Sequence, residues 1–287
     1  MSNVIAPEQP QSLTTTWPAR LELVFESRPE KTVLTRSRHL GPLRVQRAFY
    51  PEGGRAHIYI LHPPGGMVSG DDLLIAADAR DHSQVLLTTP AAGKVYRARA
   101  NQQWQRQVIS LSVGSHSCLE WLPQETIIFQ SANVELKTEI NLAKQGDVLG
   151  WDIICLARPS CDESFDKGTV VLDLTIKKMG RAVLIEKTRL NGGEEALAAR
   201  WGLSGNSVLA TFYATLDCSD DEVDGWRQRC EASGIEGRLA LTYRKGILIG
   251  RYLGAYAEPA RQMFELLWSL IRQHRGLALC RPRIWNT

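Results

Sequence analysis

Three carboxylates stand beside or inside segments where an ionised side chain is unexpected. Asp152 lies within the apolar run 151–156, Glu186 follows the apolar run 182–185, and Asp71 follows a loop rich in proline and glycine. An ionised carboxylate among apolar residues is unfavourable unless water, a cation or a hydrogen-bond donor meets it. Paired carboxylates can also serve as a general acid and a general base. These residues are therefore the first candidates for a functional site.

The ordinary interpretation of two of these carboxylates is structural. Asp152 and Glu186 would then face solvent on a sheet with one wet side, or each would pair with an arginine such as Arg158 or Arg189. The sequence alone leaves both interpretations open.

The segment 62–73, HPPGGMVSGDDL, contains so much proline and glycine between two apolar stretches that it requires an unusual backbone path. Taken alone, it could hold an active-site Ser69 or Asp71, or it could turn a tight corner. A tight corner is the more usual use of such a sequence.

Motifs of known catalytic or metal-binding mechanism are absent from the sequence. It has no G-x-x-x-x-G-K-[ST], G-x-G-x-x-G, H-E-x-x-H or G-x-S-x-G pattern, and none of its six histidines is spaced i, i+4 from another. The six cysteines form no C-x-x-C pair. His116 and Cys118 could share one face of a strand, but a permanent metal site would need more ligands. We therefore expect neither nucleotide binding nor a tightly bound cofactor.

Composition narrows the class of protein further. The 287 residues carry 34 basic and 31 acidic side chains, a formal net charge of +3, which is too small to hold a nucleic acid by phosphate contacts alone. We therefore expect no nucleic-acid partner. The cysteines are sparse, and the sequence has neither a secretory signal pattern nor an apolar run of membrane-spanning length, so we expect a cytoplasmic protein without a membrane partner.

Short runs of apolar, β-branched residues bounded by turn residues predict an all-β-dominated fold with few helices. Residues 134–140 and 170–176 alternate apolar and polar side chains, which we interpret as half-buried antiparallel sheet. Residues 259–274 have helical spacing of apolar side chains, and residues 220–232 show a weaker helical pattern. We expect a flexible segment at residues 1–20 and one domain at residues 21–287. The other predicted strands span residues 21–25, 43–49, 56–61, 73–77, 85–89, 108–113, 182–185, 208–213, 239–243 and 247–253.

Five segments resemble hallmark segments of the urease accessory protein UreD (UreH) family, in the same order along the chain. They are GPLRVQRAFYP (41–51), HPPGGMVSGDDL (62–73), LEWLPQE (119–125), WDIICLARP (151–159) and RPRIW (281–285). Within them, the residues that carry the resemblance are His62, Pro63, Pro64, Gly65, Gly66, Gly70, Trp121, Trp151, Arg281, Pro282, Arg283 and Trp285.

This resemblance implies two long, coiled and stacked β-sheet layers with a couple of helices and no catalytic activity. It also implies a scaffold that binds the apo-urease structural subunits and recruits UreF and the GTPase UreG, so that GTP hydrolysis belongs to UreG. We expect nickel(II) to be bound only transiently, in a wet internal passage lined by Asp71, Asp152 and Glu186.

Two other functions remain as alternatives. The chain could be a β-fold hydrolase or lyase that uses these paired carboxylates. It could also be a nickel-storage protein, which would need a cluster of histidine or cysteine ligands that the sequence does not display.

Overall fold

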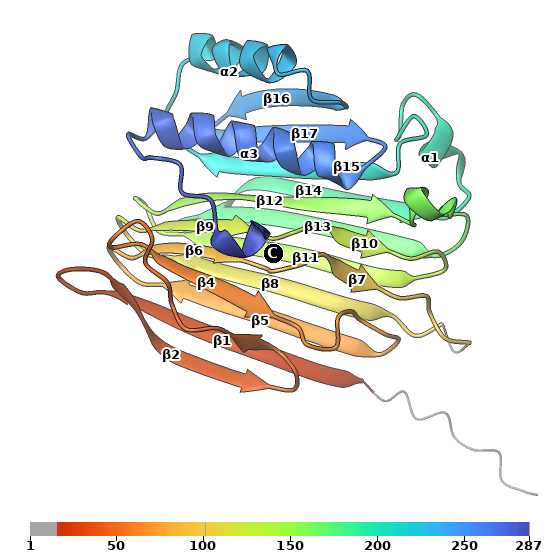
Figure 1. Cartoon of the computed structure of the whole chain (residues 1–287), viewed down its shortest axis with the longest axis horizontal. Coiled ribbons are helices and arrows are strands. Elements are labelled where there is room, and N and C mark those ends of the chain that lie inside the picture. Colours follow the sequence, from red (N-terminus) through yellow and green to blue (C-terminus); the bar gives the residue numbers. More distant parts are fainter. Residues whose placement is uncertain (1–15, 101, 287) are drawn as a thin grey trace, which may run out of the picture.

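Two stacked β-sheets form the body of the protein, and helices cover one outer face (Figure 1). The computed structural model describes residues 16–100 and 102–286. The seven-stranded sheet has the order β14 (Arg181–Asn191), β13 (Thr169–Lys178), β11 (Asn133–Leu142), β8 (Gln105–Val113), β5 (Asp71–Ala79), β1 (Trp17–Ser27), β2 (Thr32–Leu40). The ten-stranded sheet has the order β16 (Arg238–Arg244), β17 (Ile247–Gly254), β15 (Val208–Thr215), β12 (Asp147–Leu156), β9 (Cys118–Leu122), β6 (Gln84–Thr88), β4 (Ala56–Leu61), β3 (Arg44–Val45), with β10 (Thr126–Ile128) between β12 and β7 (Gly93–Val95).

Between β4 and β13 the chain passes back and forth between the two sheets. Strands β4, β6, β9 and β12 lie in the ten-stranded sheet, while β5, β8, β11 and β13 lie in the seven-stranded sheet. Each return to a sheet is made in the same direction, so neighbouring strands of this coil pair in parallel. The described chain is therefore a coil of two layers with antiparallel strands added at its ends.

This coil corrects one prediction from the sequence. Strands β11 and β13 were expected to be antiparallel, but they pair in parallel, and of the pairs that these two strands make only β13–β14 is antiparallel. Alternation of apolar and polar residues reports that one face of a strand is buried, and it does not report the direction of the neighbouring strand.

The remaining predictions of secondary structure hold with local exceptions. The strand expected at residues 43–49 shrinks to β3, in which Arg44 and Val45 pair with β4, and Phe49 makes a separate antiparallel bridge to His57. Strands β2, β7 and β10 and the short helix α1 (Glu195–Ala198) were not predicted, and no bounds were predicted for strands β9 and β12. Strand β1 begins at Trp17, so residues 17–20 belong to the domain, and the flexible segment predicted before them lies outside the described residues except at residue 16.

The space between the sheets is filled by apolar side chains from the inner face of each. Leu21 and Phe25 of β1 and Leu111 of β8 meet Ile58 of β4 and Leu119 of β9 in one buried cluster. Strand β5 shows the underlying pattern, since every second residue from Leu73 to Ala79 is buried. Burial of one face of each sheet thus holds the two layers together.

A second buried cluster lies on the outer face of the ten-stranded sheet, under helices α2 (Asp220–Ala232) and α3 (Ala257–His274). Both helices were predicted. Helix α2 begins with a capping box, in which Ser219 and Glu222 bond each other's backbone N–H groups. Helix α3 places Phe264 and Trp268 against Trp151 of β12. No helix within the described ranges is long and apolar enough to cross a membrane.

The packing of α3 generates the first testable prediction. Phe264 is fully buried and contacts the rings of Trp151, Phe212 and Tyr252. Phe264→Ala should lower the free energy of unfolding by about 3–5 kcal/mol, because it leaves a cavity in this cluster. Chemical denaturation would measure the loss, with Gln262→Ala on the exposed side of the helix as the control, expected to change stability by only about 0.5 kcal/mol. Equal effects of the two substitutions would contradict this account of the layer.

Candidate functional site

A cavity of about 750 Å³ lies between the two sheets, beside the antiparallel strands that end the coil. Its lining comes from β11, β13 and β14 of one sheet and from β12, β15 and β17 of the other. Asp152 and Glu186 are both among the lining residues, and Asp71 is not. The structure therefore brings together two of the three predicted carboxylates.

Strand register places these two carboxylates in matching rows on the facing sheets. In the ten-stranded sheet, Asp152 pairs with Thr211, which pairs with Arg251. The facing row in the seven-stranded sheet runs across Thr138, Leu174 and Glu186.

Polar contacts join the two rows at both ends. The Thr138 hydroxyl donates to Oδ2 of Asp152 at 3.3 Å, and the Arg251 guanidinium donates to Oε1 of Glu186. One carboxylate thus lies at each end of a frame that spans the cavity.

Asp152 lies in a poorly solvated environment with few partners. Burial raises the pKa of Asp152 to about 7, although the Trp121 indole and the Thr138 hydroxyl act in the opposite direction. Among the described residues, the indole Nε1 of Trp121 and the hydroxyl of Tyr213 find no hydrogen-bond partner of normal geometry, although both are buried. Asp152 lies close enough to Tyr213 to raise, together with burial, the pKa of its hydroxyl. Buried polar atoms normally have a protein or water partner. This end of the frame is therefore suited to hold water or a cation.

Glu186 occupies a more open position. It pairs with Arg251, not with Arg158 or Arg189, and Arg158 instead pairs with Glu163. The Arg251 side chain is 53% exposed, so the pair lies where the cavity meets solvent. Glu186 thus lies at the mouth of the cavity and Asp152 in its interior.

The loop of residues 62–70 is a structural corner. Its Gly65 and Gly70 have positive φ angles, and a side chain at Gly66 would clash with Tyr96. Ser69 is buried and its hydroxyl accepts from the backbone N–H of Arg99 at 2.8 Å, which leaves it unsuited to act as a nucleophile.

Asp71 also serves this corner, since its carboxylate accepts from the backbone N–H of Val68 at 2.8 Å. Asp71 does not line the cavity, so its place in the expected nickel passage stays a prediction.

His116 and Cys118 do not share a strand face. His116 lies in a turn with positive φ and stacks on His82 at 5.1 Å between ring centroids, whereas Cys118 begins β9 and is contacted by Arg275.

Several residues that carried the family resemblance have structural roles. The Trp151 indole donates to the carbonyl of Pro123, the Trp285 indole donates to the Thr88 hydroxyl, and Arg281 pairs with Glu265. The last two of these contacts fasten the C-terminal segment to the ten-stranded sheet and to α3.

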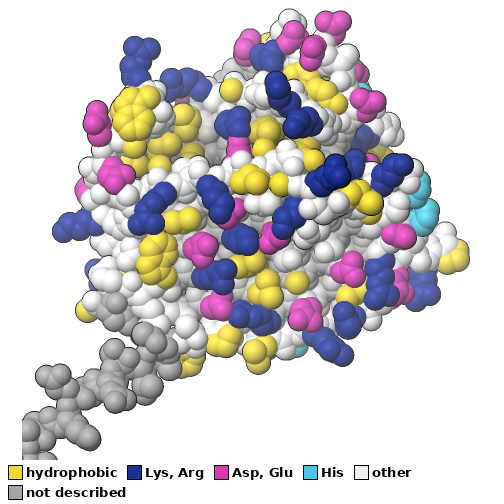
Figure 2. Space-filling view, turned by 180° about the vertical axis from the view of Figure 1, so that it is seen from behind, with side chains coloured by type: hydrophobic (Ala, Val, Ile, Leu, Met, Phe, Trp, Pro, Cys, Tyr) yellow, Lys and Arg dark blue, Asp and Glu magenta, His cyan; other side chains and the backbone are white. Residues whose placement is uncertain are grey.

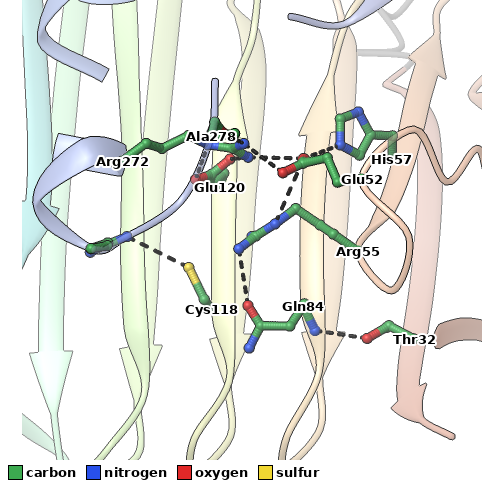
Figure 3. A network of polar contacts seen from close by, with 10 residues as sticks. Thr32, Glu52, Arg55, His57, Gln84, Cys118, Glu120, Arg272 and Ala278 are labelled. Atoms are coloured by element: carbon green, nitrogen blue, oxygen red, sulfur yellow. Dashed lines mark hydrogen bonds and ion pairs between the residues drawn. The ribbon is translucent and has the colours of Figure 1, made fainter. Parts of the chain in front are cut away.

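A buried charge network, which the sequence did not suggest, lies on the outer face of the ten-stranded sheet (Figure 3). Arg272 of α3 is fully buried and bonds Glu120 of β9 and Glu52, each at 2.6 Å, while Arg55 lies beside Glu52. Burial would raise the pKa of Glu52, but hydrogen bonds from His57 and Arg272 outweigh it and lower the pKa to about 2. Arg272 and Glu120 are far along the chain from Glu52, Arg55 and His57, so no spacing motif could reveal the whole network.

The raised pKa of Asp152 predicts how stability should depend on pH. The folded protein holds this proton more tightly than the unfolded chain, so ionisation disfavours the folded state as the pH rises from about 4 to about 7. Asp152→Asn cannot ionise and should become more stable relative to the unsubstituted protein by up to about 1.4 kcal/mol per pH unit in this window, and level off above it. Chemical denaturation at several pH values would measure the difference.

Glu139 offers a control of opposite sign. Lys177 and Lys137 lower the pKa of Glu139, so Glu139→Gln should lose stability relative to the unsubstituted protein as the pH rises. If the difference in free energy of unfolding between Asp152→Asn and the unsubstituted protein does not change with pH, Asp152 is well solvated and the account of its burial is wrong.

Comparison with known proteins agrees with the resemblance seen in the sequence. The family model for the UreD urease accessory protein matches residues 18–286. Urease accessory protein UreD of Saccharophagus degradans is 41% identical over 278 residues, covering 96% of this chain and 94% of that protein. The UreD of Dechloromonas aromatica is 38% identical over 297 residues and covers all of both chains. Together with the predicted β-rich fold, these matches show that the chain belongs to the UreD family of urease accessory proteins.

Proposed function

We propose that the chain is a non-catalytic scaffold that binds the apo-urease structural subunits, UreF and the GTPase UreG, and that nickel(II) crosses it through the cavity between the sheets. Membership of the UreD family supports the part in urease maturation. The observation that carries the passage is the frame that holds Glu186 at the cavity mouth and Asp152 in its interior.

The chemistry of the two carboxylates suits transfer of a cation. Carboxylate oxygens attract a divalent cation, whereas clustered thiolates or imidazoles would hold nickel more firmly. Both carboxylates have modest partners, a hydroxyl for Asp152 and a half-exposed arginine for Glu186, and a cation can displace either one. Nickel would therefore be attracted at the mouth, meet Asp152 inside and leave again.

An acid–base enzyme is the competing function, and one observation favours it. A carboxyl group with a pKa of about 7 is suited to act as a general acid. Glu186, the proposed partner of Asp152, is however neutralised by Arg251. The Ser69 hydroxyl accepts from the backbone N–H of Arg99, and the Asp71 carboxylate accepts from the backbone N–H of Val68. The scaffold with a passage accounts for both carboxylates and for the family.

The passage predicts that Asp152→Ala and Glu186→Ala lower urease activation several-fold while folding and partner assembly stay intact. Neither substitution strands a buried charge, because Thr138 is neutral and Arg251 reaches solvent. The measurement is the nickel content and activity of urease co-expressed with each variant, together with pull-down of the partners.

Glu139→Ala is the matched control for these variants. Glu139 lies on β11 like Thr138 but faces the other side of the sheet, where it pairs with Lys177 and Lys137. Its loss should leave activation unchanged. If Asp152→Ala and Glu186→Ala also leave it unchanged, or reduce it only because assembly fails, these carboxylates are structural. Asp71→Ala in the same assay tests the third predicted residue separately.

The rim of the cavity supplies a candidate docking surface for one of the partners. Trp201 and Ile185 line the cavity, yet they are 73% and 59% exposed. Figure 2 shows hydrophobic side chains exposed among Lys, Arg, Asp and Glu on the side of the molecule that faces away from α3. Large apolar side chains in such a setting mark protein contacts. A partner seated there would receive or deliver the cation without releasing it to solvent.

This surface predicts that Trp201→Ala weakens complex formation by about 2 kcal/mol or more, because interface tryptophans contribute a large share of binding energy. Trp17→Ala is the control, since Trp17 is 62% exposed but is not among the cavity-lining residues. Pull-down or calorimetry with co-purified partners would compare the two. If both variants bind the partners equally well, this rim is not a docking surface.

A further inference from the structure

A second set of potential metal ligands lies on the opposite face of the ten-stranded sheet from the cavity. His57 is on β4, Glu52 is in the turn before that strand, and Cys280 is in the segment that follows α3. One potential ligand atom from each of the three lies within 4.8 Å of the other two. Two distant parts of the chain, residues 52–57 and Cys280, thus bring a carboxylate, an imidazole and a thiol to one point.

The state of His57 singles out this cluster. The ring is fully buried, and its Nε2 lies 2.5 Å from Oε1 of Glu52, toward which it points in Figure 3. Its Nδ1 is buried and has no hydrogen-bond partner in the described part of the chain. Metal-bound histidines usually donate their other ring N–H to a carboxylate, which fixes the ring and leaves the first nitrogen bare. His57 and Glu52 already have this arrangement.

The surrounding charges assign different roles to Glu52 and Cys280. Arg55 and Arg272 are balanced by Glu52 and Glu120, and Arg272 holds both oxygens of Glu52. Because Arg272 occupies both oxygens of Glu52, we assign Glu52 the role of orienting His57 and not that of a metal ligand. Cys280 is a free, half-buried thiol, and as a thiolate it would supply the negative charge that a cation needs.

We propose that His57 and Cys280, oriented by Glu52, form a binding site for a borderline divalent cation such as Zn²⁺ or Ni²⁺. Imidazole and thiolate donors select this class over Mg²⁺ or Ca²⁺. As the sulfur–metal bond forms, the thiol proton passes to solvent. Two protein ligands leave two positions of a tetrahedral ion open to water or to a partner's side chain, so the ion stays exchangeable. The site is independent of the passage, and an occupied site would fasten the C-terminal segment to β4.

Cobalt(II) is a suitable probe, because a cobalt–thiolate bond gives charge-transfer absorption in the near ultraviolet. The purified full-length chain, titrated with Co²⁺, should develop this absorption to a plateau at one equivalent, and Zn²⁺ or Ni²⁺ should displace it. Bound Zn²⁺ should protect Cys280 from alkylation in the unsubstituted protein, as measured by peptide mass spectrometry. X-ray absorption at the cobalt edge should report both sulfur and imidazole neighbours.

Cys280→Ser should abolish the absorption, while Cys218→Ser, at another half-buried thiol, should retain it. The inference is overturned if no thiolate absorption appears, if Cys280→Ser retains it, if alkylation of Cys280 is unaffected by Zn²⁺, or if the cobalt spectrum lacks imidazole. Because the alkylation and titration experiments use the unsubstituted chain, the outcome does not depend on whether a variant folds. Urease activation is not part of the readout, so failure of this site and failure of the passage are distinguishable.

Discussion

The direction in which the chain returns to each sheet is the constraint on which the rest of the structure depends. From β4 to β13 the strands alternate between the two layers, and each layer grows by parallel pairing. Every strand of this coil must therefore bury one face against the other layer. The cavity lies toward the end of the coil, where the antiparallel strands β14, β15 and β17 join β11, β12 and β13 in lining it.

The interior frame shows how a carboxylate can be kept between two sheets. Asp152 bonds the Thr138 hydroxyl and lies near the Trp121 indole and the Tyr213 hydroxyl, so its neutral form is favoured until water or a cation arrives. Glu186 avoids this cost because Arg251 and solvent meet it at the mouth. The difference in environment between the two carboxylates creates a gradient from a charged entrance to a poorly solvated interior.

The outer layer depends on a different kind of contact. Helix α3 packs an aromatic cluster against β12, and its Arg272 enters a fully buried network with Glu120 and Glu52. Desolvation of such charges offsets much of their attraction, so the network's main effect is to fix one position of α3, while the aromatic cluster contributes most of the stability. The same network holds Glu52 against His57. The bond from Arg272 to the carbonyl of Ala278 also holds the segment that runs from α3 to Cys280.

By itself the sequence determined the strand-rich character of the chain, the two helices over residues 220–232 and 259–274, and membership of the family, because periodicity and short motifs are local properties. It also singled out Asp152 and Glu186, since a carboxylate beside an apolar run is visible without a structure. Only the tertiary structure decided that β11 and β13 are parallel, that Asp71 belongs to a corner, and that Arg251 is the partner of Glu186. The cluster of Glu52, His57 and Cys280 also emerged only there. Apart from the corner at Asp71 and the pair of Glu52 and His57, these contacts join residues far apart in the chain. Their proximity follows from how the coil stacks its layers, which no local pattern of side chains encodes.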